Sequence, residues 1–413
     1  MPVMDVNAQK NRSSVIVVGV DTPIGVAILR DLGRHHYFNV GIGRSASAIG
    51  FASRHCHRSE VRASTESDFI AQLLQLAHEY GDVFLIAVSE NDNLIINRHR
   101  QRLEQQMTVL APSQLMLEKV LDKNRCLGIA QSVGIRIPES FQPGSFDQVL
   151  AYSQQPLDYP RVLKWADPNE VAQALSQAGL ACEKCQYVFD AEDLVAKLEP
   201  YQAIDRFPMI QEYCAGHGVG QMFLVQDGEV KLAFQHERLH EWPPEGGVST
   251  LCKSLTLEHH GQCRERSMRL LKQLQWTGVA MVEYRYDPAK AEYYFMEING
   301  RFWGSLPLAI AAGVPFASGW VALSQGHNPQ QPRYPQLHCR YMIPETRRLL
   351  RLLFQTKAVQ DPCFRVRPLH ELVEYLRSFL RRGTHYYLYS RQDPGPFWAD
   401  VRNIMGKMTN RVR

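Results

Sequence analysis

The sequence predicts an α/β protein whose Rossmann-like first domain is followed by a region of mixed α+β character. Residues 14–19 (SVIVVG) form an apolar, β-branched run that ends in glycine, and residues 22–32 then show the apolar spacing of a helix. Residues 82–88 (DVFLIAV) repeat the pattern of a buried parallel strand. Residues 279–286 and 293–301 are β-branched and aromatic runs on either side of turn formers, which predicts an antiparallel hairpin.

The glycines of the first domain do not match a dinucleotide-binding fingerprint. Gly19 and Gly25 are separated by five residues instead of forming Gly-x-Gly-x-x-Gly. No acidic residue stands where a ribose would need one after the strand expected at residues 39–43. A nicotinamide oxidoreductase is therefore disfavoured.

Composition indicates a globular protein of several domains. The chain has 413 residues, of which 45% are hydrophobic, and this length suggests two to four domains. It contains nine cysteines, and its start (MPVMDVN) has neither a basic region nor an apolar core, so we expect a reducing, cytoplasmic location. Cys182 and Cys185 have the spacing of half a zinc or redox site, but no second pair follows at a suitable distance.

One apolar stretch has about the length of a membrane span. Residues 304–323 contain no charged side chain, but two prolines and three glycines interrupt them. Buried packing is therefore the better prediction.

Charge is distributed unevenly along the chain. Residues 331–413 hold sixteen Lys/Arg and six Asp/Glu, a net +10, whereas the rest of the chain carries −6. Because the arginines flank apolar residues at helical spacing, residues 326–413 are expected to form a linker and a basic helical extension. The favoured interpretation is a helical cap that packs against the acidic main body of the protein. The alternatives are a peripheral contact with an anionic membrane, an anionic substrate, or nucleic acid, although no nucleic-acid module is recognisable.

The hairpin carries the strongest functional signal in the chain. Its loop is expected to span residues 288–292, a register that puts Glu283 opposite Glu297. Two facing carboxylates repel one another unless a cation lies between them. Together with the amide oxygen of Asn299 they form a set of hard ligands suited to Mg²⁺ that carries nucleotide phosphates.

A structural role for the same hairpin is the alternative. Arg285 shares a strand face with Glu283, and Arg301 shares one with Glu297. In this interpretation the arginines neutralise the glutamates in a surface ladder and no metal is bound.

The segment from Glu297 to Arg301 (EINGR) resembles the metal-binding motif of the ATP-grasp superfamily. In that family a glutamate on one strand, here Glu283, and a Glu-x-Asn on the next hold magnesium, while the arginine contacts phosphate or an acyl-phosphate. Other segments stand in the family's order and extend the resemblance over about residues 14–323. They are LDK ending at Lys123 with GIRIP at 134–138, YPRVLK ending at Lys164, IQEYCAG containing Glu212, Tyr213 and Cys214, HER ending at Arg238, and GGVST at 246–250.

The resemblance implies an ATP-grasp fold between a Rossmann-like domain and the basic extension. Residues 1–115 would form the first domain, and residues 116–200 the smaller lobe of the grasp. Residues 201–325 would form the larger lobe with the metal site, and residues 326–413 the linker and extension. ATP would lie between the two lobes.

The resemblance also assigns roles at the nucleotide site. Lys123 and Lys164 would contact the phosphates of ATP. Residues 210–216 (IQEYCAG) resemble the hinge of the family, in which Glu212 with the backbone of Tyr213 and Cys214 would take the adenine edge. Mg²⁺, with Mn²⁺ as a substitute, would be held by the hairpin ligands.

The nucleotide side also departs from the family pattern. Trp165 follows the second lysine where many relatives have proline, and no glycine-rich flap is visible between residues 167 and 187. The ribose carboxylate expected after the hinge is absent. Lys184 is a further candidate for a phosphate contact.

The implied activity is ATP-dependent ligation of a small-molecule carboxylate to an amine, with release of ADP and phosphate. Arg301 would steady an acyl-phosphate intermediate, and Arg238 would hold the substrate carboxylate. His236 is a candidate proton acceptor near the amine. A homodimer is one expected assembly, because dimers are common among relatives. The alternative function is a non-catalytic ATP-binding sensor that recruits a partner through its basic tail.

Overall fold

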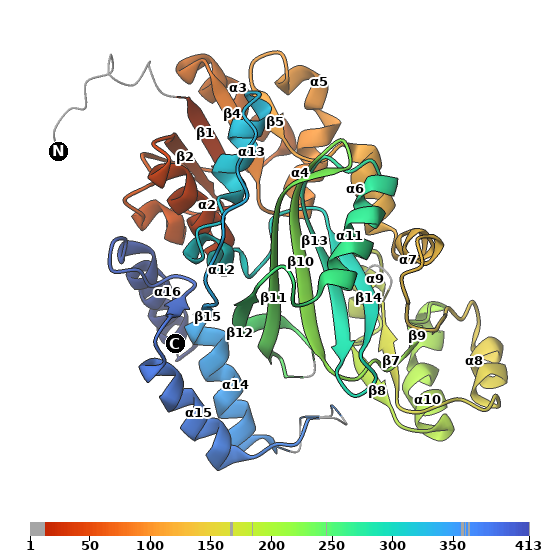
Figure 1. Ribbon diagram of the computed structural model, residues 1–413. Helices are drawn as coiled ribbons and strands as arrows, with labels where there is room; N and C mark the ends of the chain where they lie inside the picture. Colours follow the sequence, from red (N-terminus) through yellow and green to blue (C-terminus); the bar gives the residue numbers. More distant parts are fainter. Residues whose placement is uncertain are drawn as a thin grey trace.

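The computed structural model describes residues 13–412 except 166–167, 184, 245, 357–358, 360 and 362–363, and it arranges them around three β-sheets. The first domain lies above the central sheet in Figure 1, the smaller lobe lies at its lower right, and the C-terminal segments lie at its lower left. The predicted α/β class and the Rossmann-like opening are confirmed.

The first domain is built on a parallel sheet with strand order β3-β2-β1-β4-β5. All five residues of β1 (Ser14–Val18) are buried. Val15 and Val17 face one hydrophobic cluster and Ile16 and Val18 face another, because successive side chains of a strand alternate between its faces. The remaining elements are α2 (Pro23–Arg34), β2 (Phe38–Gly43), η1 (Ile49–Ala52), β3 (Arg58–Val61), α3 (Glu66–Tyr80), β4 (Val83–Ala87), α4 (Glu90–Arg98), α5 (Arg100–Leu103) and β5 (Thr108–Leu110).

The smaller lobe has an antiparallel sheet with strand order β6-β9-β7-β8. Its β9 (Met209–Glu212) pairs with β7 (Arg161–Lys164), so this sheet continues past the boundary expected at residue 200. The other elements are α6 (Gln114–Leu121), α7 (Lys123–Ser132), β6 (Ser140–Phe141), α8 (Phe146–Ser153), α9 (Pro168–Gln177), β8 (Gln186–Val188), α10 (Ala191–Leu198) and η2 (Glu199–Ile204).

The central sheet has the strand order β14-β13-β10-β11-β12-β15-β16. One face packs against α7 and α11, and the other packs against α12, α13 and the first domain. The apolar stretch 304–323 contains α12 and most of α13, and most of its residues are buried, as predicted. Among the described helices, none has the length and apolar character of a membrane span. The elements are β10 (His217–Gln226), β11 (Glu229–Trp242), β12 (Val248–Leu255), α11 (Gly261–Gln273), β13 (Gly278–Asp287), β14 (Glu292–Asn299), α12 (Leu306–Ala311) and α13 (Phe316–Ser324).

The C-terminal extension completes the central sheet. β15 (His338–Arg340) pairs antiparallel with β12, and β16 (Thr384–Tyr386) pairs parallel with β15. The expectation of a helical extension was therefore incomplete, because short strands join it to the body between its helices. Those helices are α14 (Met342–Phe354), α15 (Pro368–Leu380) and α16 (Gly395–Val412).

Asp31 on α2 connects the first domain to the larger lobe. Its buried carboxylate accepts hydrogen bonds from the backbone N–H groups of Ala317 (2.8 Å) and Ser318 (3.0 Å) and from the Ser318 hydroxyl (2.8 Å). These groups lie in the first turn of α13, whose N-cap, Pro315, makes no side-chain capping bond. Asp31 thus supplies from a distant helix the acceptor that an N-cap residue would provide.

Replacing Asp31 with alanine should lower the free energy of unfolding by about 2–3 kcal/mol, because two buried N–H groups and a hydroxyl lose their acceptor. Urea unfolding measures this change. As a control, Asp147→Ala in the exposed first turn of α8 should shift stability by less than about 0.5 kcal/mol. An Asp31→Ala chain as stable as the parent would contradict the role of this carboxylate.

Candidate functional site

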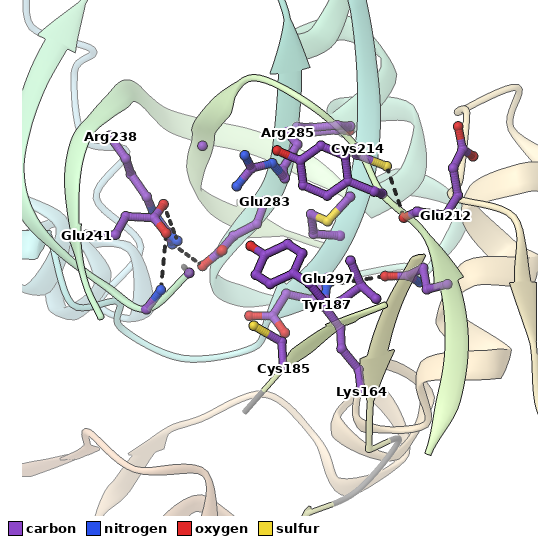
Figure 2. Close-up of a pocket in the computed structure, with 18 of the residues that line it drawn as sticks. Lys164, Cys185, Tyr187, Glu212, Cys214, Arg238, Glu241, Glu283, Arg285 and Glu297 are labelled. Carbon is purple, nitrogen blue, oxygen red and sulfur yellow. Dashed lines mark hydrogen bonds and ion pairs between the residues drawn. The ribbon is translucent and has the colours of Figure 1, made fainter. Parts of the chain in front are cut away.

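A cavity of about 250 Å³ lies between the smaller lobe and the central sheet, and we call it the interlobe cavity. Its walls come from β7 and β9 on one side and from β10, β11, β13 and β14 on the other. Figure 2 shows Arg238 and Glu283 at one side of this cavity and Glu212 and Cys214 at the other. The predicted nucleotide-site residues that line it are Lys123, Lys164, Glu212, Tyr213 and Cys214.

The polar side chains of the hinge after β9 make hydrogen bonds to other residues of the protein. The Glu212 carboxylate accepts a hydrogen bond from the backbone N–H of Glu139 (3.1 Å), and the Tyr213 hydroxyl donates to Asp361 (2.7 Å). Burial raises the pKa of Cys214 to about 12, so this thiol stays protonated. The peptide groups of the hinge, together with the uncharged thiol, are therefore what a flat heterocycle would meet here.

Two lysines bring positive charge to the interlobe cavity. Lys123 begins α7, and its Nζ donates to the carbonyl of Trp165 (3.1 Å). Lys164 ends β7, and its Nζ donates to the side-chain oxygen of Gln211 (3.2 Å). Burial lowers the pKa of Lys164. Because both acceptors are neutral oxygens, each ammonium keeps a net charge with which to attract an anion. Lys184 lies outside the described residues.

The hairpin register places Glu283 opposite Glu297, as predicted, although the loop prediction was wrong by one residue. Asp287 pairs with Glu292, so the loop spans residues 288–291, and an uninterrupted ladder would put Glu283 opposite Met296. A β-bulge at Met296 adds one residue to β14 and restores the pairing of the two glutamates.

In this structure the two carboxylates are bridged by an amide and by a guanidinium group. The Asn299 amide nitrogen lies 3.0 Å from Oε1 of Glu283 and 3.0 Å from Oε1 of Glu297. Arg238 lies 2.6 Å from Glu283 and 3.6 Å from Glu241. Burial by itself lowers the pKa of Arg238, but the surrounding carboxylates outweigh it and raise this pKa above its ordinary value.

The surface ladder considered as an alternative is not the observed arrangement. Arg285 donates to the carbonyl of Gly216, and Arg301 pairs with Glu90 of the first domain (3.1 Å). Neither arginine therefore serves as the main counter-charge of its neighbouring glutamate. Arg285 instead lines the interlobe cavity, a position that the sequence reasoning did not assign to it.

The hairpin ligands fit a hard divalent cation that keeps part of its water shell. Glu283, Glu297 and Asn299 supply carboxylate and amide oxygens, provided that Asn299 turns its amide oxygen towards the ion. Among the described residues, no group of three or more His, Cys, Asp or Glu side chains is placed to hold a metal. The oxygen donors of the hairpin suit Mg²⁺ whose remaining coordination positions are filled by phosphate and water.

A second cavity of about 300 Å³ lies on the other side of the glutamate pair, and we call it the acceptor cavity. Arg238, Gly247, Glu283 and Glu297 line both cavities and so form their common wall. Asn299 and the predicted phosphate-side Arg301 line the acceptor cavity, which also receives residues from α2 and from the C-terminal extension.

Several lining residues were missed by the sequence reasoning, and one candidate was wrong. Tyr341 and Tyr387 of the extension line the acceptor cavity, and no local sequence signal marks them. His236 is fully buried, lines neither cavity, and makes a hydrogen bond to the Ser305 hydroxyl (2.8 Å). Burial holds its pKa well below the ordinary value. His236 is therefore a core residue and not the proton acceptor.

Comparisons with known proteins point to one fold. A family model described as "ATP-grasp in the biosynthetic pathway with Ter operon" matches residues 209–346. Biotin carboxylase from Campylobacter jejuni in complex with β-γ-ATP is similar in structure, with a TM-score of 0.59 and 14% identity over 80% of this chain and 75% of that one. N5-carboxyaminoimidazole synthetase from Staphylococcus aureus has a TM-score of 0.60 and 12% identity over 85% and 86%.

A third similar structure contains a nucleotide and a metal. It is the biotin carboxylase domain dimer of the Hydrogenobacter thermophilus 2-oxoglutarate carboxylase with MgADP and bicarbonate, with a TM-score of 0.59 and 15% identity over 79% and 73%. No curated protein sequence matches this chain. The similarities establish the ATP-grasp fold.

Replacing Arg238 with glutamine should lower the free energy of unfolding of the metal-free protein by about 1–3 kcal/mol, because Glu283 loses its charge-assisted partner. Added MgCl₂ should recover part of that loss. The exposed pair of Arg98 and Glu66 provides a control, since Arg98→Gln should cost less than about 1 kcal/mol. Equal losses of unfolding free energy in the two variants, or no stabilisation of the Arg238→Gln variant by MgCl₂, would contradict the role of Arg238 as the counter-charge of Glu283.

Proposed function

We propose that this chain, which has the ATP-grasp fold, is an ATP-dependent ligase that activates a carboxylate as an acyl-phosphate and joins it to an amine. The observation that carries the proposal is the common wall of the two cavities. Glu283 and Glu297 separate the interlobe cavity from the acceptor cavity. The two lysines and the hinge line the interlobe cavity, and Arg301 lines the acceptor cavity. A phosphoryl group can be transferred between a ligand in one cavity and a ligand in the other where the two cavities meet.

In the proposed reaction, ATP occupies the interlobe cavity with its base at the hinge. Lys123 and Lys164 neutralise phosphate oxygens as point charges. A substrate carboxylate in the acceptor cavity attacks the γ-phosphorus, and ADP leaves. The amine then attacks the acyl carbon of the acyl-phosphate. The bond between that carbon and the phosphate oxygen breaks, phosphate leaves, and the nitrogen loses a proton as the amide forms.

Arg301 and Arg238 have different proposed tasks. Arg301 lines the acceptor cavity, and its planar guanidinium would hold the acyl-phosphate by two parallel hydrogen bonds in place of its contact with Glu90. Arg238 lies at the wall itself, where it would grip the substrate carboxylate once Glu283 has another counter-charge. Mg²⁺ bound by the hairpin oxygens would neutralise phosphate charge during the transfer.

The sensor alternative would need ATP binding without transfer. The described residues instead retain the full set of oxygen ligands and an arginine beyond them, arranged around two adjoining cavities. A protein that only binds ATP has no need for the second cavity behind the glutamate pair. This arrangement favours the ligase.

Incubation with ATP, Mg²⁺ and a panel of carboxylic acids and amines should release ADP and phosphate, and hydroxylamine should trap a hydroxamate of the activated acid. Glu297→Gln should lower the rate of ADP release by about 100-fold or more, because a ligand charge is lost at nearly constant shape. Glu292→Gln, on the same strand but paired with Arg136, should leave the rate unchanged. Nucleotide binding without turnover across the panel would favour the sensor.

ATP affinity should fall as the pH rises from neutrality towards the ordinary pKa of lysine. The free protein loses the Lys164 charge early because burial lowers that pKa, whereas bound phosphate favours the charged form. Titrations with a non-hydrolysable ATP analogue at pH 7 and 9.5 measure the effect. Lys164→Met should bind weakly at both values and lose most of the pH dependence, and Lys272→Met on the exposed face of α11 should behave as the parent.

A further inference from the structure

We propose that a third cavity, bounded by α2, α12 and the segment 379–392, is a separate binding site for a phosphate-bearing organic anion. Its volume is about 660 Å³, within the range of small-molecule pockets. It shares none of its lining with the interlobe cavity. The proposed ligation assigns no role to the arginines that line it.

All the charged side chains in the described lining of this cavity are basic. Arg30, Arg34, Arg381 and Arg391 line it together with His385, and the described lining includes no aspartate or glutamate. Such a concentration of one sign in a concave site attracts anions, and several guanidinium groups suit the oxygens of phosphate.

Arg30 has a structural role in this cavity, because its charge is already paired within the protein. Its Nε lies 2.9 Å from Asp393, and its Nη2 donates to the carbonyls of Leu388 (2.6 Å) and Asp393 (2.8 Å). Burial lowers its pKa, and Asp393 offsets part of that effect. Arg30 therefore fixes the C-terminal wall, and Asp393 balances its charge.

The remaining arginines supply the attraction. Within the described part of the chain, no carboxylate pairs with Arg34 or Arg391, and Arg381 makes only a loose contact of 3.9 Å with Glu374. Burial, followed by the charge of Arg34, lowers the pKa of His385. The imidazole is thus neutral near pH 7 and can donate one hydrogen bond to a bound anion.

The third cavity is adjacent to the acceptor cavity. Pro23 of α2 lines the acceptor cavity, and Ala27, Arg30 and Arg34 line the third cavity; their spacing of four, three and four residues puts them on one face of the helix. Pro23 and Arg34 are separated by about 16 Å along α2 at 1.5 Å per residue. Tyr387 lines both cavities, so an occupant of the third cavity touches a wall of the acceptor cavity.

The lining also fits an apolar part of the ligand. Ala27, Ile310 and Phe379 line the cavity beside Tyr386 and Tyr389. On α15, next to Phe379, Leu376 is 56% exposed and Leu380 is 85% exposed. The phosphate can thus belong to a soluble metabolite or to a lipid headgroup whose chains meet these leucines.

Calorimetric titration with inorganic pyrophosphate, without Mg²⁺, tests the site on the full chain. The Lys164→Met variant, impaired in the interlobe cavity, should still bind pyrophosphate. The Arg34→Gln/Arg391→Gln variant should bind at least about 10-fold more weakly, because two guanidinium contacts are lost. The Arg102→Gln/Arg269→Gln variant removes the same charge elsewhere and should bind as the parent does. Circular dichroism checks that each variant is folded.

Unchanged binding by the Arg34→Gln/Arg391→Gln variant, or no binding by the Lys164→Met variant, would overturn the proposal. Co-sedimentation with phosphatidylcholine vesicles that contain phosphatidic acid then identifies the source of the phosphate. Vesicle binding that is lost in the Arg34→Gln/Arg391→Gln variant assigns the site to a lipid headgroup. Pyrophosphate binding without vesicle binding assigns it to a soluble anion. Neither measurement depends on ATP turnover, so the ligase proposal can fail independently.

Discussion

The repulsion between Glu283 and Glu297 is the constraint around which the site is organised. The bulge at Met296 holds these carboxylates opposite one another, and such a pair is destabilising unless positive charge lies nearby. Arg238 and the Asn299 amide meet that need here. Gly218 makes the arrangement possible, since a Cβ there would lie 2.7 Å from the Arg238 side chain.

The position of this pair gives the protein two adjoining cavities instead of one. β14 is an edge strand of the central sheet and β13 is its neighbour, and the carboxylates that they carry line the cavity beside the smaller lobe. The acceptor cavity on their other side is bounded by α2 and by the extension, which belong to different parts of the sequence. A carboxylate pair at such a junction can interact with two ligands at once, which is what a transfer reaction requires.

Helix α2 keeps these parts in place by buried polar contacts. Asp31 caps α13, and the neighbouring Arg30 fixes the C-terminal segment through Asp393. Each contact is satisfied on both sides, and an unsatisfied group at either position would cost more than the pair contributes. The first domain thus supports the walls of both the acceptor cavity and the third cavity.

The sequence by itself determined the elements and the chemistry of the hairpin. Apolar periodicity and β-branched runs are local properties, so the parallel opening, the two long strands and the buried stretch at 304–323 could be read directly from the chain. The pairing of Glu283 with Glu297 was also predicted, although the expected loop length was wrong and the bulge at Met296 compensated for it.

Only the tertiary structure decided what surrounds that pair. Arg238 as its counter-charge, His236 as a core residue and the tyrosines of the extension as cavity walls depend on contacts between residues far apart in the chain. β15 and β16 are three residues each, too short to give a periodic signal, and they form because a sheet edge is present to pair with them. Local patterns specify secondary structure and donor atoms, whereas packing determines which donors meet and which of them a ligand can reach.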